Sequence, residues 1–253
     1  MLPVVAVPTT AGTGSEVGQA VVITDDESHV KRVIFHQKMV PAIVILDPEL
    51  TVGLPAKLTA ATGMDALAHN VEAFCAPVYH PMAEGIALEG MRLVKDFLPR
   101  ATKQGDDIDA RLQMQVASSM GAVAFQRGLG GIHAVSHSLG AVYDAHHGLL
   151  NAIVMPYMLQ ANRPVIEDEM ARAARYLDLP KQNFDGMLDW ILDLRSELGI
   201  PHTLAEMDIP ADDAEKIGAM AIEDPTAGGN PIQFTADQYA ALFLDAHGGR
   251  LEF

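Results

Sequence analysis

The feature that most constrains the fold is a change of pattern near residue 55. Up to that point the chain shows short apolar runs, separated by small residues, prolines and polar clusters, which is typical of β-strands. Beyond it, apolar residues recur with a spacing near 3.6 almost to the C-terminus, which is typical of amphipathic helices. The sequence therefore predicts an α/β segment over residues 1–54, followed by an all-helical domain over residues 55–253.

The same patterns predict the individual elements. Apolar runs predict strands at residues 4–7, 19–24, 30–36 and 41–46, with a hairpin turn at residues 25–28. Periodic segments predict helices at residues 57–74, 82–98, 110–125, 132–146, 166–177, 184–198, 211–222 and 236–247. Thr235 and Gln238 form a capping box for the last helix. Gly148 follows the helix predicted at 132–146 and is expected to end it.

Composition narrows the class of protein. Of the 253 residues 49% are hydrophobic and 20% are charged, so the chain can bury a core and is not disordered. The 33 acidic against 17 basic residues give a net charge of −16, which argues against binding to a nucleic-acid backbone. Cys75 is the single cysteine, which excludes an internal disulfide and favours a reducing, cytoplasmic location. No stretch predicts a membrane span or a signal peptide, so we expect no membrane partner.

Spacing of acidic and histidine residues carries the strongest chemical signal. Asp65 and His69 are four residues apart in an apolar helical segment, and His133 and His137 repeat this spacing in another. Any one of these histidines could be a hydrogen-bonded core residue, but the set as a whole indicates a metal site. A carboxylate with neutral imidazoles suits Fe²⁺, Zn²⁺, Mn²⁺ or Co²⁺. Spacing alone leaves the ligands open among six candidates, which are Asp65, His69, His133, His137, His146 and His147.

Four motifs in this order resemble a known family. They are PTTAGTGSE at residues 8–16, GMDALAH at 63–69, GLGGIHAVSH at 128–137 and HHG at 146–148. With the late GGNP at residues 228–231, they resemble the iron-containing (group III) alcohol dehydrogenases over the whole chain. The resemblance implies that residues 1–54 are the C-terminal remainder of a Rossmann-like dinucleotide-binding domain. It implies that residues 55–253 form an all-helical metal-binding and catalytic domain, with the active site in the cleft between the two.

The resemblance also implies roles for the candidate ligands. The positions that match the family's metal ligands are Asp65, His69, His133 and His147. His137 matches a non-ligand histidine close to the reaction centre, which makes it a candidate for proton transfer or substrate positioning. His146 matches no functional position.

A second set of positions is implied to contact NAD or NADP. On the residues alone, segment 8–16 is a small-residue loop that could approach a pyrophosphate, or simply a turn. The resemblance implies that Thr9, Thr10 and Thr13 in this loop contact the dinucleotide. It also implies that Lys31 lies near the nicotinamide and Leu50 near the adenosine, although Lys31 could equally be an exposed strand residue.

The activity implied is hydride transfer between a small alcohol or aldehyde and NAD(P), with a metal polarising the substrate oxygen, in a homo-oligomer. The family also has a Gly-Gly-Gly-Ser loop upstream of the Thr-Thr motif, and this chain has no such loop. A second hypothesis is therefore a truncated metal-binding chain that cannot hold the dinucleotide and acts as an interaction partner. A third, a metal-dependent hydrolase, is less favoured because the sequence offers no extra carboxylates for a two-metal site.

Overall fold

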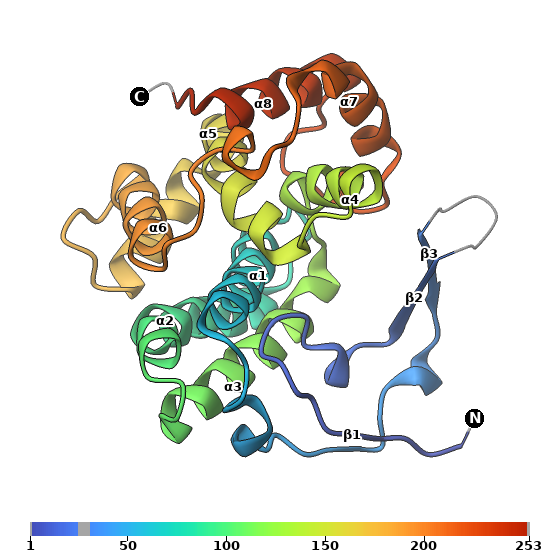
Figure 1. Ribbon diagram of the computed structural model, residues 1–253, viewed down its shortest axis with the longest axis vertical. Helices are drawn as coiled ribbons and strands as arrows, with labels where there is room; N and C mark the ends of the chain where they lie inside the picture. The colour runs from blue at the N-terminus through green and yellow to red at the C-terminus, as the bar shows by residue number, and fades with distance from the viewer. Residues whose placement is uncertain (1, 25–30, 252–253) are drawn as a thin grey trace.

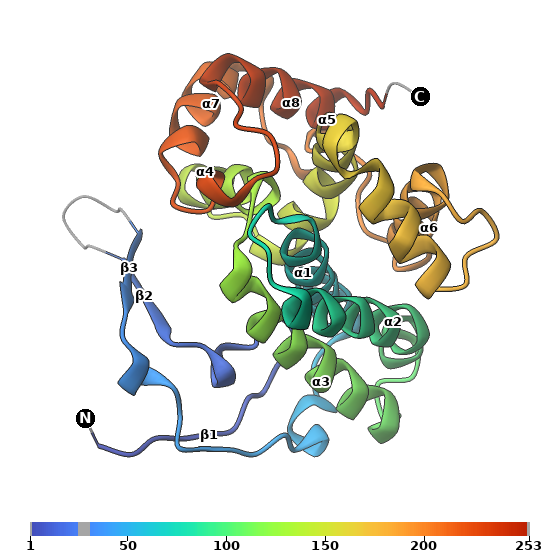
Figure 2. The ribbon, with the colours of Figure 1, turned by 180° about the vertical axis from the view of Figure 1, so that it is seen from behind.

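The protein consists of a helical body with a smaller strand-containing part on one side, as the two opposite views of the computed structural model show (Figures 1 and 2). The structure describes residues 2–24 and 31–251. The α-helices are α1 (Ala56–Cys75), α2 (Pro81–Lys103), α3 (Ile108–Ala124), α4 (Gly131–Tyr143), α5 (His147–Tyr176), α6 (Phe184–Glu197), α7 (Ala214–Glu223) and α8 (Ala236–Gly248). The predicted fold class, strands followed by an all-helical region, is confirmed.

Helix α1 lies at the centre of the helical body and packs against α2, α3 and α5. From Thr59 to Cys75 every residue of α1 except Thr62 is buried, including Asp65 and His69. Its many small residues allow this close packing, because a short side chain lets neighbouring helices approach. The polar side chains of α1 are therefore held inside the protein by the packing of apolar neighbours on all sides.

The strands form two separate pairs. β1 (Val5–Ala6) pairs in parallel with β4 (Ile43–Val44), and β2 (Ala20–Thr24) pairs antiparallel with β3 (Lys31–Phe35). The β2–β3 hairpin extends away from the helices (Figure 1), and its predicted turn at residues 25–28 lies outside the described residues. The short helices η1 (Ser15–Val17) and η3 (Pro48–Thr51) contact α3 and join this part to the helical body.

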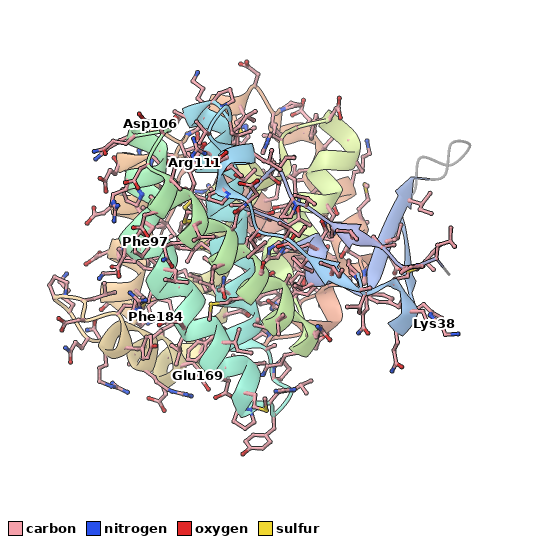
Figure 3. All side chains as sticks on the ribbon, turned by 90° about the horizontal axis from the view of Figure 1, so that it is seen from below. Lys38, Phe97, Asp106, Arg111, Glu169 and Phe184 are labelled. Atoms are coloured by element: carbon pink, nitrogen blue, oxygen red, sulfur yellow. The ribbon has the colours of Figure 1, made fainter. Side chains whose placement is uncertain are left out.

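Short 3₁₀ helices occur at several further connections. They are η2 (Gln37–Met39), η4 (Phe125–Arg127), η5 (Ala205–Met207), η6 (Ala211–Asp213) and η7 (Ala227–Gly229). The view from below (Figure 3) shows Lys38, beside β3, far from Phe97 and Arg111 on the helical body.

The predicted capping box is confirmed, since Thr235 and Gln238 cap α8 reciprocally.

The prediction of one helix over residues 132–146 is wrong at its C-terminal end. α4 stops at Tyr143, because Asp144 takes a left-handed conformation with φ of 52°. Asp tolerates this conformation better than most residues do. The chain then restarts as α5, so His147 is the first residue of a new helix rather than the end of α4.

The helix predicted at residues 166–177 is only the last part of α5. α5 begins at His147 and continues through Pro156 and Pro164. Each proline removes one backbone donor, but the buried residues around Pro156 pack tightly enough to keep the helix continuous.

The domain division after residue 54 stays a prediction, and the first α-helix begins at Ala56. Among the described helices, none combines the length and apolar character needed to cross a bilayer.

Candidate metal centre

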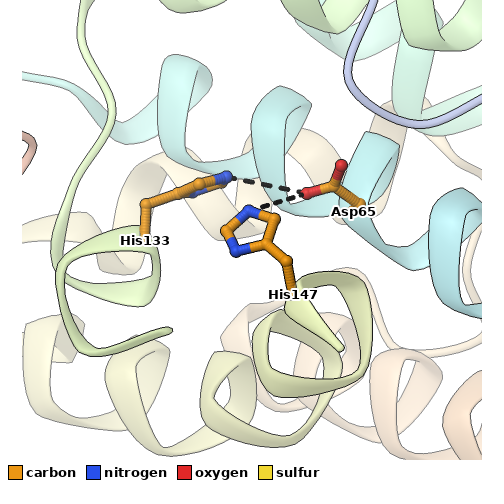
Figure 4. A group of neighbouring side chains, drawn as sticks. All are labelled: Asp65, His133 and His147. Carbon is orange, nitrogen blue, oxygen red and sulfur yellow. Dashed lines mark ion pairs between the residues drawn. The ribbon is translucent and has the colours of Figure 1, made fainter. Parts of the chain in front are cut away.

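Three helices bring a carboxylate and three histidines together. Asp65 and His69 lie one turn apart on α1, His133 lies in the first turn of α4, and His147 is the first residue of α5. Figure 4 shows the rings of His133 and His147 both directed at the carboxylate of Asp65. These four residues, here called the Asp–His cluster, are the four that match the family's ligand positions.

The distances within the Asp–His cluster fit a single metal ion. Asp65 Oδ1 lies 3.8 Å from His69 Nε2, 3.7 Å from His133 Nε2 and 3.5 Å from His147 Nε2. One ligand atom each from Asp65, His133 and His147 also lie within 4.8 Å of one another. Ligands bound tetrahedrally at about 2.1 Å would lie about 3.4 Å apart. The donor set therefore fits a divalent cation of the iron or zinc type.

Hydrogen bonds at the far side of two rings determine which nitrogen faces Asp65. His69 Nδ1 lies 3.3 Å from the carbonyl oxygen of Gly12, and His133 Nδ1 lies 2.6 Å from Glu72 Oε2. A carbonyl or carboxylate oxygen can only accept, so both Nδ1 atoms carry the hydrogen. In the neutral rings, the lone pair then lies on Nε2, which faces the centre, as a metal ligand requires.

Electrostatics also favour a cation at this point. Burial lowers the pKa of His69 to about 4 and that of His147 to about 3, so both rings are neutral near pH 7. Burial alone would likewise lower the pKa of His133. The charges of Glu72 and Asp65, and their hydrogen bonds with the His133 ring, outweigh the effect of burial and raise the pKa of His133 to about 9. Burial alone would raise the pKa of Asp65, yet the surrounding histidines lower it overall. The negative potential that holds a proton on His133 would also attract a metal ion.

Two polar residues of this site were missed from the sequence. Glu72 lies seven residues after Asp65, nearly two helical turns, so it shares the same face of α1. Asn151 lies four residues after His147, and its side-chain nitrogen is 2.8 Å from Asp65 Oδ1 and 3.1 Å from His147 Nε2. The helical spacing was a signal in both cases. Glu72 stands at helical spacing from Asp65, and Asn151 stands at helical spacing from His147, so both lie on a helix face that already carries a candidate ligand.

His137 lies beside the Asp–His cluster and is tied to a carboxylate of its own. Its Nδ1 is 2.9 Å from Asp224 Oδ2, and its ring stacks on that of His147 at a centroid distance of 5.2 Å. The side chains of His137 and His147 are 31% and 36% exposed, so these two stacked rings border solvent while Asp65, His69 and His133 are buried. His146 is exposed and precedes α5, and neither an ion pair nor a hydrogen bond of its side chain is found among the described residues.

The loop predicted to contact the dinucleotide lies against the same helices. Gly12, Gly14 and Glu16 are buried, and Glu16 Oε1 accepts a hydrogen bond of 2.5 Å from Ser119 on α3. The side chains of Thr9, Thr10 and Thr13 are exposed, which leaves their hydroxyls free to meet a ligand. The carbonyl of Gly12 reaches His69, so this loop touches the Asp–His cluster directly.

Lys31 and Leu50 are the other two predicted cofactor contacts. Lys31 begins β3, and its side chain lies outside the described part of the structure. Leu50 lies in η3 and is 49% exposed. The assignments of all five cofactor positions, of the four ligands and of His137 remain predictions.

Comparison with known proteins identifies relatives over nearly the whole chain. Residues 59–247 match the C-terminal model of the Fe-containing alcohol dehydrogenase family, and residues 1–48 match the iron-containing alcohol dehydrogenase model. A 4-hydroxybutyrate dehydrogenase of Cupriavidus necator is 43% identical over 95% of this chain and 64% of its own length. An NAD-dependent methanol dehydrogenase of Bacillus methanolicus is 38% identical over 97% of this chain and 66% of its own length.

Solved structures agree with this relationship. A 1,3-propanediol oxidoreductase superimposes with a TM-score of 0.93 at 36% identity, covering 96% of this chain and 66% of that one. A sulfoacetaldehyde reductase of Bifidobacterium kashiwanohense, solved with NAD⁺, superimposes with a TM-score of 0.88 at 29% identity, covering 97% of this chain and 65% of that one. The chain thus spans about two thirds of the length of the relatives it matches.

Proposed function

The chain belongs to the iron-containing alcohol dehydrogenase family, and we propose that it acts as a metal-dependent dehydrogenase of small alcohols with NAD or NADP. The relatives named above oxidise or reduce small alcohols and aldehydes, according to their names, and one of them is described as NAD-dependent. Because the chain spans about two thirds of their length, its activity is a proposal rather than a property carried over from them.

The observation that carries the proposal is the Asp–His cluster. One carboxylate oxygen and three Nε2 atoms converge from α1, α4 and α5, with two of the rings held in the correct tautomer by Gly12 and Glu72. A divalent ion bound there can expand from four to five ligands, so a substrate oxygen could be added to the four protein donors. We propose Fe²⁺ as the ion, with Zn²⁺ or Mn²⁺ as alternatives that suit the same donors.

A bound metal would polarise the substrate oxygen and the nicotinamide would exchange the hydride. The residues of the chain would hold the ion and the dinucleotide in place. Asp65, His69, His133 and His147 would fix the ion, and the exposed hydroxyls of the loop at residues 8–16 would contact the dinucleotide.

His137 has the geometry for proton transfer. Its Nδ1–H donates to Asp224, so its Nε2 carries a lone pair that can accept the proton of a substrate hydroxyl. The partial exposure of the His137 side chain offers that proton a way to solvent.

The test uses the full chain loaded with Fe²⁺ or Zn²⁺ and assayed with short primary alcohols and diols. We expect reduced nicotinamide to appear only when both the metal and NAD⁺ or NADP⁺ are present. Activity that survives complete removal of the metal would contradict the proposal, and so would binding of metal without any binding of NAD(H) or NADP(H).

A second candidate function is favoured by the exposed strands. Val5 of β1 and Ile43 of β4 are each 55% exposed, although both belong to a two-stranded parallel pair. Parallel sheets are normally covered on both faces. A metal-binding chain that acts as an interaction partner through this surface would bind metal in the test above and fail to bind the dinucleotide.

A further inference from the structure

Glu72 is a buried carboxylate that contacts two groups at the start of α4. The residue is 7% exposed and lies on α1, two turns beyond Asp65. Its Oε1 accepts a 2.6 Å hydrogen bond from the backbone N–H of Ile132, and its Oε2 accepts one of 2.6 Å from His133 Nδ1. One carboxylate therefore fixes both the backbone that carries His133 and the ring itself.

The neighbouring backbone donor is held by another residue. The N–H of Gly131 donates to Asn230 Oδ1 at 3.0 Å, and Asn230 in turn bonds Asn162. Gly130, which precedes the helix, has no side chain to cap it. Glu72 and Asn230 thus share the capping of α4, but only Glu72 touches a member of the Asp–His cluster.

We propose that Glu72 is a positioning residue that sets the metal affinity of the site through His133; this inference rests on the proposed function. It orients the ring, bonds the Nδ1 hydrogen and leaves Nε2 facing Asp65, so that a metal which displaces the Nε2 proton meets the lone pair. Carboxylates that bind the far nitrogen of a metal-bound histidine hold the ring in place and make it a better donor.

Charge gives Glu72 a second effect on the same site. A divalent ion bound by neutral imidazoles and Asp65 would leave one net positive charge in a buried environment. Glu72 supplies the missing negative charge at the distance of one imidazole ring, and a buried site is least costly when its charges cancel. Among the described residues, no arginine or lysine forms an ion pair with Glu72; Arg127 bonds the carbonyls of Ala73, Phe74 and Val78 and pairs with Glu84.

The test compares Glu72→Gln with a matched control. The amide keeps the size of the side chain and one acceptor, but it removes the charge and cannot accept from both donors. Zn²⁺ alone is the probe, and its Kd is measured by competition with a chromophoric chelator in the absence of alcohol and nucleotide. We expect Glu72→Gln to weaken Zn²⁺ binding about 10- to 100-fold.

The control is Asn230→Ser, which weakens the other cap of α4 without touching His133. It is expected to lower the Tm of the metal-free protein while leaving the Zn²⁺ Kd within about twofold of the wild type. An equal Kd in Glu72→Gln and wild type would overturn the inference, as would an equal loss in both variants, since that would indicate a purely structural cap.

A third variant keeps the experiment decisive if Glu72→Gln does not fold. Glu72→Asp retains the charge on a shorter stem, so it is expected to bind Zn²⁺ more tightly than Glu72→Gln and less tightly than the wild type. If neither variant folds while Asn230→Ser does, Glu72 acts in the stability of the fold and the inference is overturned. Failure of the wild type itself to bind Zn²⁺ would instead contradict the proposed function.

Discussion

At the scale of single residues, the site is organised by what each imidazole does with its second nitrogen. Three histidines donate a hydrogen bond from Nδ1: His69 to the carbonyl of Gly12, His133 to Glu72 and His137 to Asp224. All three therefore present Nε2 elsewhere, and for His69 and His133 that direction is Asp65. A ligand role for His69 and His133 and a proton-transfer role for His137 would therefore differ in position rather than in the chemistry of the side chain.

His137→Ala separates these two roles. Because His137 makes no contact with Asp65 among those described, the variant should keep its metal, while turnover of the metal-loaded protein falls by about 10²–10⁴-fold if the ring transfers a proton. Metal content and alcohol oxidation are measured on the same sample. Loss of metal in this variant would show instead that His137 is a ligand.

Metal affinity should depend on pH through His133. The pKa of His133 is raised to about 9, so below that pH a metal must displace its proton. Affinity should therefore rise by about tenfold for each pH unit up to pH 9 and level off above it. His69 and His147 do not add to this slope above about pH 5, because burial lowers their pKa values to about 4 and about 3.

The measurement is the Zn²⁺ Kd from pH 6 to pH 9, with His137→Ala as the control that should retain the same slope. An affinity that is constant over this range would mean that His133 is not the residue that exchanges its proton for the metal.

Much of this site could be predicted at the residue scale. Asp65 and His69 are four residues apart on a helix, so their convergence follows from the helical repeat. The approach of His133 and His147 to Asp65 depends on how α4 and α5 pack on α1, which no local pattern contains. The prediction that His133 and His147 join Asp65 and His69 therefore came from the resemblance to the family. Glu72 shares the face of Asp65 by helical spacing alone, but its contact with His133, 61 residues away, depends on how α4 packs on α1.

At the scale of elements, the break between α4 and α5 is what brings His147 to the site. The sequence predicts a helix that runs to His146, but Asp144 turns the chain and α5 starts at His147, against α1. Helix propensity alone does not locate this break, because Val142, Tyr143 and His146 all have similar, intermediate propensities and only one residue, Asp144, is left-handed. Gly148 then takes the role of a contact residue rather than that of a helix terminator.

Gly148→Ala tests this contact. An added Cβ would lie 2.2 Å from the backbone carbonyl oxygen of Ala61 on α1, so the first turn of α5 must move, and His147 with it. We expect a loss of about 1–3 kcal/mol in the free energy of unfolding, measured by urea denaturation, together with weaker Zn²⁺ binding. The matched control is Gly85→Ala in α2, where no atom lies within 4 Å of the new Cβ. Equal stability and equal Zn²⁺ affinity in the two variants would contradict the proposed contact.

At the scale of the whole molecule, the helical body and the strands differ in how well they are covered. Large apolar side chains fill the helical body, whereas Val5, Ile23, Phe35 and Ile43 of the strands are each at least half exposed. Exposed apolar strands favour association. The surface over β1 and β4 is therefore where we expect another copy of this chain to pack.

The double variant Val5→Thr with Ile43→Thr tests whether copies of this chain meet through that surface. We expect light scattering after size exclusion to show an oligomer for the wild type and a smaller species for the variant, with metal content unchanged. The control is Val165→Thr, an exposed apolar position on α5 (51% exposed), which should not alter the mass. The same oligomer in all three proteins would place the interface elsewhere.

The most direct test of the Asp–His cluster as a metal centre is the metal content of the full chain. We predict that the wild type, stripped with chelator and reconstituted with Fe²⁺ or Zn²⁺, retains one ion per chain after desalting. His133→Ala is predicted to retain none, because it removes a ligand, whereas His146→Ala, at an exposed neighbouring position, is predicted to retain one. An ion in His133→Ala at full occupancy, or none in the wild type, would contradict the assignment.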